Sequence, residues 1–160
     1  MIKEFEPVTH ELLILVDQWV PKLLGLPIPV ITERRNSQNR TIKQITGHMI
    51  DSVSNNTHRA VHLQYQTSPL QFPNYASNGN NDRWIAIQNY QNEDWQNMVM
   101  LWKYMNLHFV YVVQNVNPSK LDNLWQCSKE KFIPLKDGII DYLRHFRLHL
   151  GEIDELISLK

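Results

Sequence analysis

Three histidines, His48, His145 and His149, carry the clearest chemical signal in this sequence. His145 and His149 stand four residues apart in a segment of helical periodicity, so both imidazoles lie on one face, about one turn from each other. Two imidazoles at this spacing can bind one metal ion. Histidines at the edge of a helix also occur as plain hydrogen-bonding residues, and the spacing alone leaves both interpretations open.

The apolar faces of the helices place these histidines at the edge of the core. At about 100° per residue, His145 and His149 lie roughly 80° to 120° from the centre of the apolar stripe on the last helix. By the same reckoning His48 lies roughly 115° from the stripe on its own helix. One histidine from one helix and two from another would supply three ligands and leave a coordination position for water or substrate.

Other polar residues lie on the same helical faces as these histidines. At offsets of four, seven and eleven from His48 stand Ser52, Asn55 and Arg59. This polar ribbon along the boundary of the core suits a cleft better than a dry interior. Tyr142 lies on the same side of the last helix as the two histidines. Asp51 lies farther round its helix, where we expect it to be exposed or paired with a basic neighbour.

The remaining histidines offer competing sites. His58 and His62 are also four residues apart, but they point farther from the apolar stripe and are expected to face solvent. His108 lies at the edge of a third apolar stripe. We expect His108 to be a pocket residue or to lie just behind the metal ligands. A site with four ligands that includes His108 is a further alternative.

Composition limits the classes of function. Basic and acidic residues both number 16, so the excess of positive charge that attracts nucleic acid is missing. A length of 160 residues with 42% hydrophobic residues suits one folded domain, residues 1–160. No apolar run approaches the ~20 residues that span a bilayer. Cys127 is the sole cysteine and the first residues lack a signal peptide, so a cytoplasmic location is expected.

Four amphipathic segments predict four long helices. The first is capped by Thr9 and ends before Gly25, and the second follows the capping-box pair Thr41 and Gln44 and runs to about Tyr65. The third runs from residue 92 to the Asn-Pro pair at 117–118, and the last is opened by the proline at 134 and runs nearly to the C-terminus. These elements predict an all-α protein, an antiparallel four-helix bundle.

The connection between the second and third helices is long. Residues 66–92 contain Pro69, Pro73 and the Asn-Gly-Asn-Asn cluster at 78–81, with one short helix expected from residue 82 to 89. Connections of this length are often functional or partly mobile. The linker at residues 124–133 has room for a brief hairpin.

Three stretches resemble the DinB and YfiT-like superfamily. Residues 45–59, ITGHMIDSVSNNTHR, resemble its second-helix motif, roughly GH, two hydrophobic residues and DS, followed by NN and Arg. Residues 101–108, with Leu101-Trp102, Asn106 and His108, resemble the third helix, and residues 141–150, DYLRHFRLHL, resemble the last. Together they extend the resemblance over most of the chain.

The resemblance implies a DinB-type bundle that holds a divalent metal, most often zinc or nickel, through His48, His145 and His149. Characterised members include transferases and isomerases that use low-molecular-weight thiols. A metal-dependent S-transferase or hydrolase acting on a small molecule, with such a thiol as cosubstrate, is therefore implied. Residues 73–84 depart from the family pattern, because Asn and Gly replace a shorter and more acidic segment. This loop is expected to edge the pocket.

Two functions follow from these observations. In the first, a metal-bound water or thiol is the nucleophile of an enzyme, and pocket residues orient the substrate. The expected pocket residues are Asp51, Ser52, Asn55, Arg59, His108 and Tyr142. In the second, the chain is a noncatalytic bundle, either a stress-associated binder of a metal or small ligand or a dimerisation module that forms a homodimer. An accessible metal site beside a cleft would distinguish the enzyme from the binder.

Overall fold

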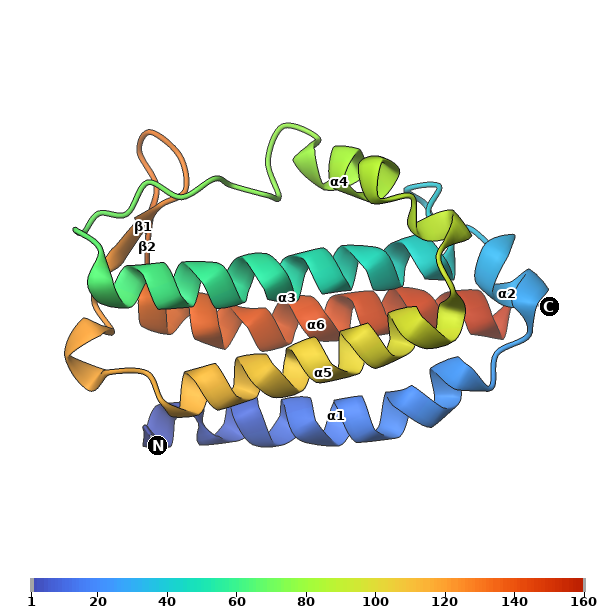
Figure 1. Cartoon of the computed structure of the whole chain (residues 1–160), viewed down its shortest axis with the longest axis horizontal. Helices are drawn as coiled ribbons and strands as arrows, with labels where there is room; N and C mark the ends of the chain where they lie inside the picture. Colours follow the sequence, from blue (N-terminus) through green and yellow to red (C-terminus); the bar gives the residue numbers. More distant parts are fainter. Residues whose placement is uncertain (1, 160) are drawn as a thin grey trace.

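The apolar periodicity of the sequence forms four long helices in the computed structural model, which describes residues 2–159 (Figure 1). The long helices are α1 (Glu6–Leu24), α3 (Ile42–Tyr65), α5 (Trp95–Gln114) and α6 (Leu135–Ser158). The shorter elements are η1 (Lys3–Phe5), α2 (Ile28–Thr32), α4 (Asn80–Gln88), η2 (Tyr90–Asn92), η3 (Pro118–Lys120) and the hairpin strands β1 (Leu124–Gln126) and β2 (Phe132–Pro134). The predicted all-α four-helix bundle, its long connection before α5 and the brief hairpin are confirmed.

The directions of the four long helices do not alternate in chain order, as they do in a simple up-and-down bundle. In Figure 1, α1 and α6 run in one direction and α3 and α5 in the other. The contacting pairs α1–α5 and α3–α6 are therefore antiparallel, whereas α3 and α5 are parallel neighbours. The cause is the connection at residues 66–92, which returns along the length of α3 before α5 begins. Parallel neighbours require such a crossover, because a short loop can join only antiparallel helices.

The start of α3 agrees with its capping signal. The backbone N–H of Gln44 donates to Thr41 Oγ1, and the backbone N–H of Thr41 donates to Gln44 Oε1 at 3.0 Å, which completes the predicted capping box. Pro134 stands directly before α6, also as predicted. The second helix and the last therefore begin where the local sequence indicates.

The predicted start of the first helix was wrong. Helix α1 begins at Glu6 with Pro7 in its first turn, a position that proline favours because its missing N–H is not needed there. Thr9 lies inside the helix, and its hydroxyl donates back to the carbonyl of Phe5 at 3.0 Å. A threonine that bonds to the preceding turn satisfies its own hydroxyl without capping the helix.

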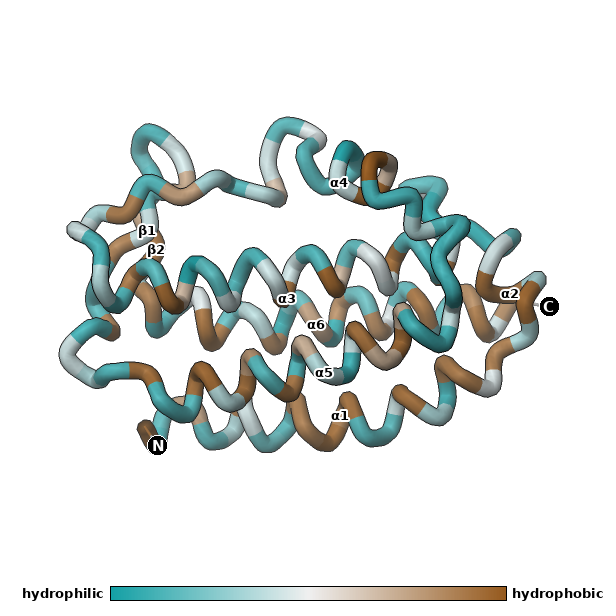
Figure 2. Tube along the Cα trace, viewed as in Figure 1, coloured by the Kyte–Doolittle hydropathy of each residue, from teal (hydrophilic) through white to brown (hydrophobic). Residues whose placement is uncertain are grey.

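Aromatic side chains fill the centre of the bundle. Trp102 of α5 is fully buried and stacks on Phe146 of α6, with ring centroids 5.4 Å apart. Hydrophobic positions recur along all four long helices in Figure 2, whereas much of the 66–92 connection is hydrophilic. Within residues 2–159 no helix combines the length and apolar character needed to cross a bilayer.

The polar connection covers a face of α3 that would otherwise meet water. Helix α4 and the turn η2 both pack on α3, opposite the side that faces the core. The first half of α3 is consequently buried on nearly all sides, polar positions included. A helix that is buried by two layers of structure can hold polar side chains away from solvent, and this is where the histidine of α3 lies.

Candidate metal centre

His48 of α3 meets His145 and His149 of α6 where these two antiparallel helices pack together. The centroid of the His149 ring lies 4.5 Å from that of His48 and 4.4 Å from that of His145. One nitrogen from each ring lies within 4.8 Å of the others. Over residues 2–159, no other group of three His, Cys, Asp or Glu side chains has this geometry.

Each of the three rings has a hydrogen-bond partner at Nδ1. His48 Nδ1 lies 2.6 Å from the hydroxyl of Tyr75, and His149 Nδ1 lies 2.9 Å from Glu152 Oε2. His145 Nδ1 lies 3.4 Å from the hydroxyl of Ser52. The Glu152 carboxylate can only accept, so His149 carries its proton on Nδ1. Outer partners of this kind fix the tautomer of a metal-binding histidine and leave Nε2 as the ligand.

The spacing of the two Nε2 atoms of α6 fits a divalent metal. His145 Nε2 and His149 Nε2 are 3.1 Å apart. Nitrogens bound to tetrahedral zinc at its usual bond length are separated by about 3.3 Å. If both rings keep their protons on Nδ1, two lone pairs face each other at this distance, and a cation between them removes the repulsion. The donor set is also suitable, because neutral imidazole is a good ligand for zinc and nickel.

Burial keeps two of these rings neutral. Removal from water, assisted by the neighbouring His149, His145 and Arg40, lowers the pKa of His48 to about 2. Burial together with His149 lowers the pKa of His145 to about 4. Metal binding needs the unprotonated ring, so the two imidazoles are ready for a metal at neutral pH without losing a proton.

These depressed pKa values predict acid sensitivity of the metal-free protein. Below pH 6.5 the unfolded chain takes up protons on His48 and His145 that the folded chain refuses, so stability present at neutral pH is lost as the pH falls. The expected loss at pH 5 is about 2 kcal/mol for each histidine. Urea unfolding of chelator-treated protein at pH 7 and pH 5 measures it.

The matched controls are single glutamine variants. His48→Gln should reduce the pH dependence by about half, because His145 keeps its own contribution. His58→Gln, at an exposed position of the same helix, should keep the dependence of the parent. Equal unfolding free energies at pH 7 and pH 5 in the parent would show that the buried rings do not stay neutral.

Asp51 is not exposed, contrary to the expectation from its helical position. It is 2% exposed and accepts hydrogen bonds from the Tyr90 hydroxyl at 2.7 Å and from Gln88 Nε2 at 2.6 Å. Its other oxygen lies 3.4 Å from the Tyr75 hydroxyl. Burial raises the pKa of this carboxyl, although the three hydrogen bonds oppose the shift. The cover formed by residues 66–92 supplies all three donors, which explains the difference.

Asp51 and Tyr75 form an outer layer behind His48. The tyrosine hydroxyl accepts from His48 Nδ1–H and donates its own proton toward Asp51 Oδ2, an order that satisfies each group. On α6, burial acts to raise the pKa of Glu152. The hydrogen bond to His149 opposes this shift, as do the nearby Arg40 and Asn36, and the pKa of Glu152 lies below its usual value. Both carboxylates thus support imidazole rings.

A cleft of about 540 Å³ opens beside His145. The predicted polar ribbon of α3 lines it, as does the loop expected to edge the pocket. Its walls include Ser52, Asn55, Asn56, Arg59, Asn74, Tyr75, Trp125, Lys131, Asp141, Tyr142, Arg144 and His145. His48 and His149 lie behind this wall, 3% and 5% exposed. The histidine cluster is therefore approached from the cleft, past His145.

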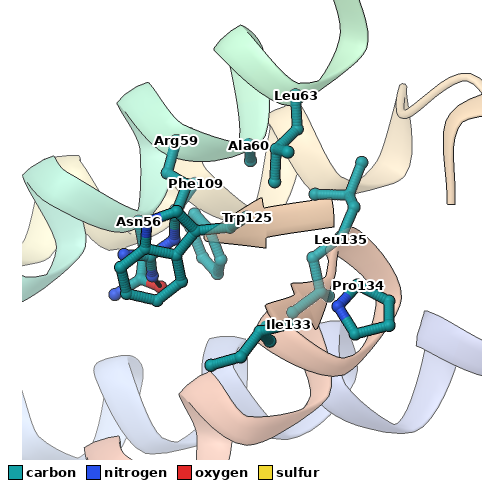
Figure 3. Close-up of a pocket in the computed structure, with 11 residues that line it drawn as sticks. Asn56, Arg59, Ala60, Leu63, Phe109, Trp125, Ile133, Pro134 and Leu135 are labelled. Atoms are coloured by element: carbon teal, nitrogen blue, oxygen red, sulfur yellow. Dashed lines mark hydrogen bonds between the residues drawn. The ribbon is translucent and has the colours of Figure 1, made fainter. Parts of the chain in front are cut away.

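The far end of the cleft is formed by the hairpin. Figure 3 shows the Arg59 side chain beside the indole of Trp125 and near Asn56. The guanidinium carbon lies 3.8 Å from the centre of the indole ring. Removal from water lowers the pKa of Arg59 to about 10, a value at which the group keeps its charge at neutral pH. The cleft thus has imidazoles at one end and a cation at the other.

Two of the expected pocket residues serve other purposes. His108 is exposed on α5 and lines a separate groove with His58 and His62, so the structure does not bring it to the histidine cluster. Tyr142 reaches the cleft wall, but it is 3% exposed and its hydroxyl donates to Asn106 Oδ1 at 2.6 Å. This bond between α6 and α5 ties the cleft wall to the core.

Four residues around the histidines and Asp51 were not among the predicted site residues, namely Tyr75, Gln88, Tyr90 and Glu152. A signal existed for Glu152, because a carboxylate three residues after His149 lies on the same helical face. The other three come from the 66–92 connection, where no periodicity indicates which side chains turn inward. Their positions depend on how the connection lies across α3.

The fold has a solved counterpart. The structure is similar to YfiT from Bacillus subtilis, with a TM-score of 0.78 and 14% sequence identity over 98% of this chain and 87% of that one. YfiT is described as a probable metal-dependent hydrolase with an unusual four-helix bundle topology. At this identity the similarity establishes the fold, and it confirms the expected YfiT-like bundle. No family model and no curated protein sequence matches this chain.

Proposed function

We propose that this protein is a metal-dependent enzyme that acts on a small molecule bound in the cleft beside His145. The observation that carries the proposal is the convergence of His48, His145 and His149. Their Nδ1 atoms all have partners, and the Nε2 atoms of His145 and His149 lie 3.1 Å apart. A cleft next to these nitrogens offers the space for a substrate that a closed structural metal site lacks.

A divalent ion held by the three histidines would lower the pKa of a coordinated water or thiol and so supply a nucleophile near neutral pH. The protein's own residues prepare this position. Tyr75 and Glu152 keep protons on Nδ1 of His48 and His149, so that Nε2 is the free nitrogen. The packing of the 66–92 connection on α3 keeps bulk water from the rear of the cluster.

Hydrolysis and thiol transfer share this first step and differ in which nucleophile is bound. The description of YfiT supports hydrolysis, and the motif resemblance supports transfer from a low-molecular-weight thiol. The identity of the metal as zinc or nickel, the thiol cosubstrate, the homodimer, the single domain and the cytoplasmic location stay predictions. The cleft beside the cluster favours an enzyme over the noncatalytic bundle.

Cobalt(II) provides a direct test of the open coordination position. The chelator-treated protein should take up about one cobalt per chain and develop the strong visible bands of a four-coordinate ion. Adding 2-mercaptoethanol should then produce a sulfur-to-cobalt charge-transfer band in the near ultraviolet. Azide, as a second small probe, should shift the visible bands.

The contrary result is equally clear. If the protein binds cobalt but its spectrum responds to neither 2-mercaptoethanol nor azide, the metal site is closed. The protein is then a noncatalytic metal-binding bundle. The Tyr65→Phe variant, altered at an exposed position of α3, serves as the unperturbed control.

A further inference from the structure

We infer that the substrate carries a carboxylate, which Arg59 binds at the end of the cleft away from the histidines. The inference rests on the proposed function and adds the chemical class of the substrate. It follows from a charged side chain in the cleft wall that has packing partners but no counterion.

The surroundings of Arg59 hold its guanidinium in place without neutralising it. One face lies over the indole of Trp125, 3.8 Å from the ring centre, and one N–H donates to the side-chain oxygen of Asn56. Within residues 2–159, no carboxylate oxygen lies within 4.0 Å of its nitrogens. An indole face and an amide oxygen stabilise a cation, but neither supplies a negative charge.

A cation without a counterion is costly in a partly buried position. Burial disfavours the charged form and depresses the pKa of Arg59, and the group nevertheless stays charged at neutral pH. An anion bound in the cleft would stabilise the charged guanidinium and so offset the free energy that Arg59 loses by its removal from water. A planar carboxylate matches the remaining N–H donors of the guanidinium fork.

The other charges of the cleft wall do not take this role. Arg144 is exposed and forms an ion pair with Asp141 at 2.6 Å, so its charge is already balanced. Lys131 is exposed. Arg59 is therefore the cation of the wall that combines burial, a fixed position and an uncompensated charge.

The spacing along α3 gives a length scale for a molecule that reaches from His145 to Arg59. Ser52 contacts His145 and precedes Arg59 by seven residues. At 1.5 Å per residue, the two positions are about 10 Å apart along the helix axis. An extended chain of some eight carbon atoms spans a distance of this order, which sets the length of the probes used below.

Two matched thiols measure the contribution of the carboxylate. The probes are ω-mercaptooctanoate and ω-mercaptooctanol, titrated into the cobalt(II) protein and followed by the sulfur-to-cobalt band. The carboxylate probe should bind about 10-fold more tightly than the alcohol. Arg59→Gln should reduce this preference to within about twofold, and Arg59→Lys, which keeps the charge but loses the fork, should retain part of it.

A metal-free arm separates the carboxylate site from the metal site. Octanoate added to the metal-free protein should shift the NMR signals of the Arg59 side-chain N–H and the Trp125 indole N–H, and octanol should not. The Arg59→Gln spectrum also shows whether that variant is folded. Arg144→Gln, at the paired and exposed arginine, should respond to octanoate as the parent does.

The outcomes of the two arms are distinct. Equal affinity of the two thiols, with cobalt bound normally, overturns the carboxylate inference and leaves the proposed function standing. Octanoate shifts in a protein that binds no metal support Arg59 as the carboxylate site and overturn the metal-dependent function. Octanoate shifts that persist in Arg59→Gln place the anion elsewhere and overturn the inference.

Discussion

Alanine at any one of His48, His145 or His149 should reduce bound metal from about one ion per chain to less than about a tenth of that. The three rings are the protein ligands that the structure brings together, and two remaining imidazoles hold a divalent ion too weakly to survive purification. Elemental analysis of protein purified without a histidine tag measures the effect. The loss should be equal in the three variants, because each removes one of three ligands.

The competing histidines supply the control. His58→Ala and His62→Ala remove imidazoles with the same four-residue spacing, outside the cluster, and should keep the metal of the parent. In Glu152→Gln, which replaces the charged acceptor of His149 Nδ1–H by a neutral amide, metal affinity should fall about 10- to 100-fold. A folded parent that takes up no zinc, nickel or manganese would rule out the metal-dependent enzyme.

The second large effect is expected from Gly47→Ala, which should destabilise the fold by about 1–3 kcal/mol. A methyl group at this position would lie 2.2 Å from Cδ2 and 2.4 Å from Cγ of the Tyr90 ring. The ring cannot move aside freely, because Tyr90 is 5% exposed and its hydroxyl donates to Asp51. Alanine favours a helix over glycine by about 1 kcal/mol, which is too little to offset this overlap.

Gly151→Ala on α6 is the matched control. Its added methyl group would meet nothing within 4 Å, so it should leave stability unchanged or raise it by up to about 1 kcal/mol. Urea unfolding of the three proteins compares them directly. A Gly47→Ala protein as stable as the parent would mean that η2 does not rest on α3 as the structure has it. The close approach also gives a physical reason for glycine at position 47, directly before His48.

Much of the fold is already present in local sequence patterns. Apolar residues at helical spacing indicated all four long helices, and the Thr41–Gln44 pair marked the start of α3. The pairing of His145 with His149 is equally local, because residues four apart on a helix always share a face. Such features depend on neighbours within a few residues, so the sequence suffices to predict them.

The complete site depends on contacts between distant parts of the chain. Spacing alone left the role of His48 open, and the resemblance of residues 45–59 to the DinB motif favoured it. Helical projection placed Asp51 toward solvent because it counted one covered face of α3. The connection covers a second face, buries Asp51 and brings Tyr75 within 2.6 Å of His48.

The sequence therefore specified the helices, the histidine pair of α6 and the polar ribbon of α3, all of which follow from the helical repeat. The tertiary structure decided the parallel course of α3 and α5, the layer of Tyr75 and Asp51 behind His48, and the position of Arg59 over Trp125. The physical reason is the same in each case. These features arise from the way residues 66–92 and the hairpin pack on α3, and no short-range repeat encodes that packing.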